Sequence, residues 1–205
     1  MAQFTAKDVQ ELRKQAGVGM MDAKQALGDA GGDFEKAVEL LRERGLASAA
    51  KRAGREASEG TIGTYLHTQN DHVVMGVLVE LACETDFVAK SAEFGEVAND
   101  IAMHVSWANP GWIRREEADA AAVAKEAELI EREARAAGKP EQAIAKIVEG
   151  RLDKFYRDNI LYEQEFVNKE KFQGTVGDLV TALAAKMGEN ISVRRVARVG
   201  VGESV

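Results

Sequence analysis

The side chains best suited to chemistry stand together in the short segment Cys83-Glu84-Thr85-Asp86. A cysteine thiolate can act as a nucleophile, and carboxylates can transfer protons when a pocket shifts their pKa values. The neighbours of Cys83, Ala82 and Glu84, bring no group that lowers a thiol pKa, which favours a buried structural cysteine. With one cysteine and three histidines the chain offers no zinc pattern, and it has no glycine loop of the phosphate-binding kinds. We therefore expect no catalytic residues, no metal site, and a protein that acts by binding.

The composition is that of a globular protein of one or two domains, with 205 residues of which 45% are hydrophobic and 30% charged. No apolar run approaches the roughly 20 residues that span a bilayer, and the N-terminus lacks the apolar stretch of a secretory signal. A single cysteine excludes an intrachain disulfide and fits the cytosol. The net charge of -7 argues against non-specific coating of nucleic acid. We expect a cytoplasmic protein with no membrane contact and no direct nucleic-acid binding.

Residues 1–45 have the pattern of three short helices that form an N-terminal module. Thr5 and Asp8 have the spacing of a capping box, and Asp33 suits an N-cap position. The sequence Gly17-Val18-Gly19 predicts a break after the first helix. A bundle of this size has a small core and little stability of its own.

Residues 46–60 read as a basic, partly helical linker with almost no large apolar side chain. A solvated linker is the favoured interpretation. An RNA-facing patch is the alternative, formed by the basic side chains in and just before this segment: Arg42, Arg44, Lys51, Arg52 and Arg55.

Residues 61–205 predict an α+β core that carries a helical hairpin at about residues 116–157. Alternation and turn residues indicate two strands joined by a tight turn, and a third strand near the C-terminus. Helices are expected before Asn109-Pro110-Gly111, whose residues stop a helix, and after a cap formed by Thr175 and Asp178. The strands are expected at 61–67, 72–83 and 191–199, in a small antiparallel sheet with helices packed against it.

Three stretches of this chain together resemble the elongation factor Ts family. They are LRKQAGVGMMDAKQAL with GDFEKAVELLRERG after it, ACETDFVAKSAEF, and IVEGRLDKFYRDNILYEQEFV. They occur in the family's order, so the resemblance extends from about residue 3 to 203. The first stretch looks like the family's N-terminal module, which is similar to ubiquitin-associated domains. The chain resembles a short form of the family with a single core copy.

The resemblance implies a non-enzymatic exchange factor that releases GDP from the GTPase elongation factor Tu. Such a factor has no cofactor of its own, because GDP, GTP and Mg²⁺ belong to the partner. In the family, the motif matched here by Thr85, Asp86, Phe87 and Val88 inserts beside the partner's Mg²⁺ site. From the residues alone, Asp86 could instead cap the following turn, with Phe87 in the protein's own core.

Further contact positions of the family match Arg13, Met20, Met21 and Lys24 in the N-terminal module, and His104 in the core. Methionine suits adaptable binding surfaces because its side chain is flexible and polarizable. Adjacent helical residues point about 100° apart, so one of the two methionines is expected to be buried and the other exposed. A structural role is the alternative for His104.

The resemblance leaves a homodimer or a 2:2 complex with elongation factor Tu open. Two rival functions also remain at this point. One is an RNA- or protein-binding adaptor, motivated by the three-helix module and the basic linker. The other is an enzyme that uses Cys83, Glu84 or Asp86, which would require a pocket that the sequence cannot show.

Overall fold

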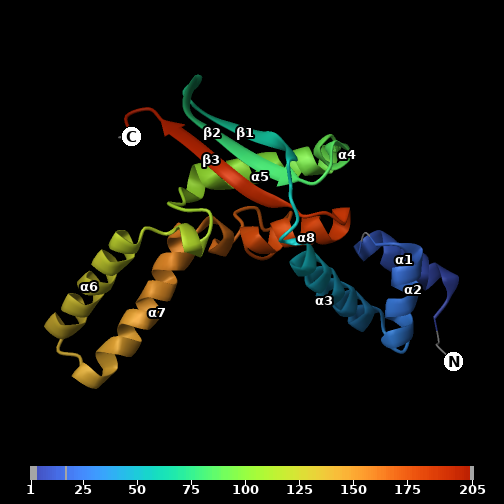
Figure 1. Ribbon diagram of the computed structural model, residues 1–205, viewed down its shortest axis with the longest axis horizontal. Helices are drawn as coiled ribbons and strands as arrows, with labels where there is room; N and C mark the ends of the chain where they lie inside the picture. The colour runs from blue at the N-terminus through green and yellow to red at the C-terminus, as the bar shows by residue number, and fades with distance from the viewer. Residues whose placement is uncertain (1–3, 17, 204–205) are drawn as a thin grey trace. The chain divides into compact units, whose positions relative to one another are not determined.

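Residues 4–16 and 18–203 are described by the computed structural model. Of the predicted break at Gly17-Val18-Gly19, Gly17 lies outside the described residues, and Val18 and Gly19 lie between two helices, as expected. The chain forms two compact units. The first combines the chain up to Gly60 with Ala82–Ala89 and Val180–Ser192, and the second contains Thr61–Leu81, Lys90–Leu179 and the chain from Val193. Helices and a three-stranded sheet occur together (Figure 1), which confirms the α+β fold class.

The first unit begins with three helices, α1 (Ala6–Ala16), α2 (Met20–Asp29) and α3 (Phe34–Arg52), as expected. Because α3 continues to Arg52, the expected boundary at residue 45 falls inside a helix, and the first part of the expected linker, residues 46–52, is helical. Burying apolar side chains between the three helices supplies their main stabilisation. The shared core consists of Val9, Leu12, Ala23, Ala26, Leu27, Ala37 and Leu41.

The helix caps in this unit follow the sequence signals. The backbone N–H of Thr5 donates to the Asp8 carboxylate at 2.6 Å, and the N–H of Asp8 donates to Oγ1 of Thr5 at 3.3 Å. At α3, the N–H of Lys36 donates to the Asp33 carboxylate at 3.1 Å. These bonds satisfy backbone donors that have no partner within their own helix.

The sheet has the order β1 (Glu59–Gln69), β2 (His72–Cys83), β3 (Ser192–Gly200). Between β1 and β2, Asn70 and Asp71 both have positive φ, 49° and 62°. Two such residues in succession form the tight turn whose twist matches a hairpin. The predicted hairpin is therefore confirmed.

Helix α5 (Ala92–Ala108) packs against one face of the sheet. Gly63 of β1 lies so close to this helix that a Cβ atom on it would stand 2.1 Å from the Ala98 carbonyl oxygen. The helix ends at Asn109, which has a φ of 44° and the left-handed conformation. The largest fully buried side chains of this unit are Val77, Val79, Leu81, Phe94, Ile101, His104, Ile130, Ile160, Leu161 and Phe166.

Helices α6 (Ala120–Ala136) and α7 (Glu141–Asn159) form the predicted hairpin and run side by side in Figure 1. Their contact seam is narrow: Ile130 and Ala134 of α6 and Ile144 of α7 are buried. The hairpin therefore has an apolar stripe rather than a core of its own.

One longer helix and three single-turn helices complete the described part of the fold. Helix α8 (Val176–Met187) begins at a capping box in which the Thr175 N–H donates to Asp178 at 3.0 Å. The other three are single turns: α4 (Asp86–Ala89), η1 (Arg115–Glu117) and η2 (Leu161–Glu163). Across the described part of the chain, no helix has both the length and the apolar character needed to cross a membrane.

Candidate partner-binding site

The segment Thr85–Val88 forms a tight turn at the start of α4, directly after β2. Thr85 takes the N-cap position: its Oγ1 accepts the N–H of Val88 at 3.4 Å and its carbonyl accepts the N–H of Ala89 at 3.2 Å. Val88 points inward and is buried, whereas Phe87 is 84% exposed. The interpretation that placed Phe87 in the protein's own core is therefore wrong. Asp86 begins the helix and is also exposed.

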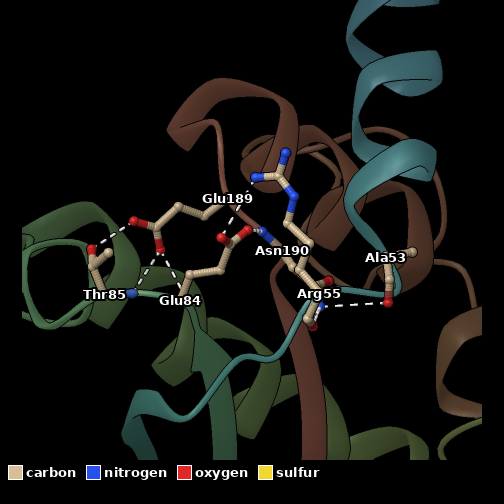
Figure 2. Close-up of polar contacts among 6 residues, drawn as sticks. All are labelled: Ala53, Arg55, Glu84, Thr85, Glu189 and Asn190. Carbon is tan, nitrogen blue, oxygen red and sulfur yellow. Dashed lines mark hydrogen bonds and ion pairs between the residues drawn. The ribbon is translucent and has the colours of Figure 1, made fainter.

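The turn is held by Glu189, which follows α8 (Figure 2). One oxygen of its carboxylate accepts the N–H of Glu84 at 2.9 Å and the N–H of Thr85 at 3.1 Å. The other oxygen accepts the Thr85 hydroxyl at 2.6 Å. A charged acceptor makes stronger hydrogen bonds than a neutral one, so these three bonds fix the backbone at the start of the turn.

Further polar contacts connect Glu84, just before the turn, with Asn190 and with Arg55, which follows α3 (Figure 2). The Glu84 carboxylate accepts the N–H of Asn190 at 2.7 Å and lies 3.5 Å from the Arg55 guanidinium. The Asn190 side-chain amide donates to the Arg55 carbonyl at 2.6 Å. Three chain segments that are distant in sequence therefore meet in one polar network.

Cys83 belongs to the structure of this turn. Its thiol is buried and donates to the Thr85 carbonyl, with 3.3 Å between sulfur and oxygen. Burial, reinforced by the negative charge of Glu189, raises the pKa of the Cys83 thiol to about 11. The thiol is therefore protonated at neutral pH and is a poor nucleophile, which supports the structural interpretation of this cysteine.

Glu189 and Asn190 are the site residues that sequence reasoning missed. The sequence signal nearest to them is Gly188, which follows α8 with a φ of 75°, a conformation that glycine adopts readily at a helix end. That local signal says where the helix stops. It does not pair Glu189 with Thr85, which lies 104 positions earlier in the chain.

The N-terminal module presents a second group of exposed side chains on α1 and α2. Met20 is 43% exposed and Met21 is 74% exposed, and Arg13 and Lys24 are exposed too. The expectation that one methionine is buried is wrong, because Ala23 and its helical neighbours on the inner face fill the core instead. Met20, Met21 and Lys24 lie within one turn of α2 and can form a continuous contact surface.

His104 is placed differently from the other matched residues, since its side chain is fully buried in α5. Its Nδ1 accepts the N–H of Val167 at 3.2 Å, and its Nε2 lies 3.0 Å from Oε1 of Gln164. This pattern requires a neutral imidazole with the proton on Nε2, and burial lowers the pKa of His104. The ring also stacks on Phe166 at 5.9 Å. These contacts show a structural role, and direct contact with a partner stays a prediction.

The exposed Phe87 on a turn fixed by its own chain, and the exposed methionines and cations of α1 and α2, are side chains of the kinds found in protein–protein interfaces. Comparison with known proteins specifies the family. The family model for Elongation factor TS matches residues 33–173. Elongation factor Ts of Fervidobacterium nodosum is 48% identical over 201 residues, covering 98% of this chain and 100% of that protein.

Other relatives agree. Elongation factor Ts of Thermosipho melanesiensis is 49% identical over 200 residues, covering 98% of this chain and 100% of that protein. Elongation factor Ts of Desulforamulus reducens is 47% identical over 205 residues, covering 100% of this chain and 92% of that protein. The chain belongs to the elongation factor Ts family and is a translation elongation factor.

Proposed function

We propose that this protein is a guanine-nucleotide exchange factor for elongation factor Tu. It binds the GDP-bound GTPase, disturbs the Mg²⁺ and phosphate site and promotes GDP release, so that GTP can bind. The observation that carries this proposal is the exposed Phe87 on a turn that the protein holds in place. Membership of the elongation factor Ts family supports it.

The mechanism needs binding energy and no covalent chemistry, so the protein is not an enzyme and requires no cofactor. Phe87 inserts into the partner and buries apolar area worth roughly 2 to 3 kcal/mol. Asp86 competes for polar groups that order the shell of the Mg²⁺ ion. The factor prefers the nucleotide-free partner, and linkage makes the effect reciprocal: bound nucleotide weakens the factor's binding by the same amount.

The N-terminal module supplies docking affinity through Arg13, Met20, Met21 and Lys24. Their exposure supports this assignment, and flexible methionines adapt to a partner surface at low cost. The protein acts in the cytoplasm, where elongation takes place, and its net charge of -7 supports a protein partner rather than a nucleic acid.

Release of a fluorescent GDP analogue from elongation factor Tu tests the function. The wild type accelerates release. Phe87→Ala lowers the rate at saturating factor by about 30-fold, since it removes about 2 kcal/mol of contact made during displacement. Met21→Ala is the contrasting variant: it raises the concentration needed for half-maximal release and leaves the saturating rate nearly unchanged.

Both side chains are exposed, so the circular dichroism of the two variants matches that of the wild type. Absence of any acceleration by the wild type, on elongation factor Tu from the same organism, would overturn the exchange function. Unchanged release with Phe87→Ala would overturn the wedge role of the ring alone.

We also propose that two copies associate through the sheet face opposite α5, giving a homodimer or a 2:2 complex with the partner. Gly63 faces α5, and side chains alternate along a strand, so Ile62 and Leu66 lie on the opposite face. Leu78 of β2 is exposed between two buried residues and lies on that face as well. We call Ile62, Leu66 and Leu78 the outer sheet face. Neighbouring exposed apolar side chains of this kind mark interaction surfaces.

A further inference from the structure

The Thr85–Val88 turn is too short to maintain its own geometry. Helix α4 has only four residues, and one helical turn fixes many dihedral angles for very few hydrogen bonds. Phe87 adds little, because its side chain is mostly exposed. The direction in which Phe87 points must therefore be set by contacts with other parts of the chain.

Glu189 supplies three of these contacts. Its carboxylate accepts two successive backbone N–H groups, those of Glu84 and Thr85, and also the Thr85 hydroxyl, at 2.6 to 3.1 Å. The hydroxyl in turn accepts the N–H of Val88. The bonds thus run in a chain from Glu189 to Thr85, as Figure 2 shows, and from Thr85 into the first turn of α4.

The approach of Glu189 is itself fixed by the backbone. Gly188 ends α8 with a φ of 75°, a conformation that reverses the chain direction there. On the other side of Glu189, the backbone N–H of Asn190 donates a hydrogen bond to the Glu84 carboxylate. The Asn190 side-chain amide donates one to the Arg55 carbonyl. The N–H of Gly188 also donates to the Ala184 carbonyl at 3.0 Å, so the residues on both sides of Glu189 are held by hydrogen bonds and Glu189 has little freedom to leave the turn.

We propose that Glu189 is the positioning residue of the exchange reaction: it holds the Thr85–Val88 turn so that Phe87 points outward before the partner arrives. The proposal rests on the proposed exchange function. A turn ordered in advance loses less entropy on insertion, so its effect falls on the displacement of GDP. Docking through α1 and α2 is a separate contribution and is largely unaffected.

Hydrogen exchange in the free protein tests the positioning without any partner. In Glu189→Ala the backbone amides of Glu84, Thr85 and Val88 exchange at least about 10-fold faster, since loss of hydrogen bonds to a charged acceptor opens the turn. Glu189→Gln keeps a carbonyl oxygen that can accept both amides, and it restores most of the protection. Glu39→Ala removes an exposed glutamate of α3 outside this network and serves as the control.

GDP release from elongation factor Tu tests the consequence. Glu189→Ala lowers the rate at saturating factor by about 10-fold and changes the half-maximal concentration by less than about 3-fold, and Glu189→Gln recovers the rate. Thr85→Val is the milder second variant, because it loses only the hydroxyl bonds. Combined with Glu189→Ala it causes less further loss than it does alone, since both changes break the same link.

Amide exchange and GDP release together distinguish a failure of the positioning proposal from a failure of the exchange function. If the wild type does not accelerate GDP release, the exchange function is wrong, and amide exchange still decides whether Glu189 orders the turn. Unchanged amide exchange in Glu189→Ala would overturn the proposal. GDP release at the wild-type rate by a Glu189→Ala variant whose turn has become mobile would also overturn it. The same holds if Glu189→Ala changes only the half-maximal concentration and leaves the saturating rate unchanged.

Discussion

The buried side chain of His104 is expected to link the stability of this protein to pH. The buried His104 ring accepts one hydrogen bond from Val167 and donates one to Gln164. A second proton on the ring would replace the accepting nitrogen with a donor that faces another donor. Acid is therefore expected to weaken the segment that His104 holds against α5.

The sign of the pH effect follows from the lowered pKa of His104. In the unfolded chain the pKa of this histidine is about 6.5. Above that pH both states are neutral and the stabilisation is complete. Below it the unfolded state binds a proton that the folded state resists, so stability falls as pH drops, by at most about 1.4 kcal/mol per pH unit.

Denaturant unfolding between about pH 7.5 and about pH 5.5 measures this effect. The wild type should lose more stability over this range than His104→Gln, which lacks the titrating group. The exposed histidines, His67 and His72, are present in both proteins, and their contributions cancel in the comparison. Equal slopes for the two proteins would contradict the assignment of a neutral, hydrogen-bonded ring.

Between elements, the contact of β1 with α5 depends on one missing side chain. A Cβ on Gly63 would lie 2.1 Å from the Ala98 carbonyl oxygen and 2.8 Å from the Ala98 side chain. Because the atom approached is in the helix backbone, the clash could be relieved only if the whole helix moved away from the strand. Gly63 is therefore a requirement of close packing rather than of chain flexibility.

Gly63→Ala should lower the free energy of unfolding by about 2 kcal/mol or more, because overpacking forces the helix away from the sheet. Gly95→Ala is the matched control. Gly95 lies in α5 with open space where a Cβ would be, so alanine there should stabilise by about 0.5 to 1 kcal/mol. Chemical denaturation of both variants measures whether each change lowers or raises the free energy of unfolding. A stable Gly63→Ala variant would show that the sheet and helix separate easily.

Elements and hairpins with local signals could be predicted from the sequence, whereas contacts between residues far apart in the chain could not. The β1–β2 hairpin, the α6–α7 hairpin and the caps at Thr5, Asp33 and Thr175 depend on residues close to one another in the chain. The end of α3 was missed because its last turns contain small and charged residues that give no apolar stripe. Glu189 was missed because its partners are set by tertiary structure alone.

For the whole molecule, the outer sheet face predicts self-association. The wild type should sediment with about twice the chain mass of 22.2 kDa. Leu66→Asp combined with Leu78→Asp should give a monomer with unchanged circular dichroism, because both side chains are exposed in one copy and the charges would be buried between two.

The control for the dimer is Leu129→Asp, which places the same charge at an exposed leucine of α6. It should leave the mass of the association product unchanged. A wild type that remains monomeric at every accessible concentration would contradict the proposed use of this face.

The unit that carries Phe87 is assembled from three separate stretches of the chain, the last of which is Val180–Ser192. During synthesis, α1 to α3 and the Thr85–Val88 turn leave the ribosome long before Glu189 does. In the proposed mechanism, a nascent chain therefore has its docking helices before the turn that carries Phe87 acquires Glu189, the residue that orders it. The proposed exchange surface therefore becomes complete only after α8 and Glu189 have been made.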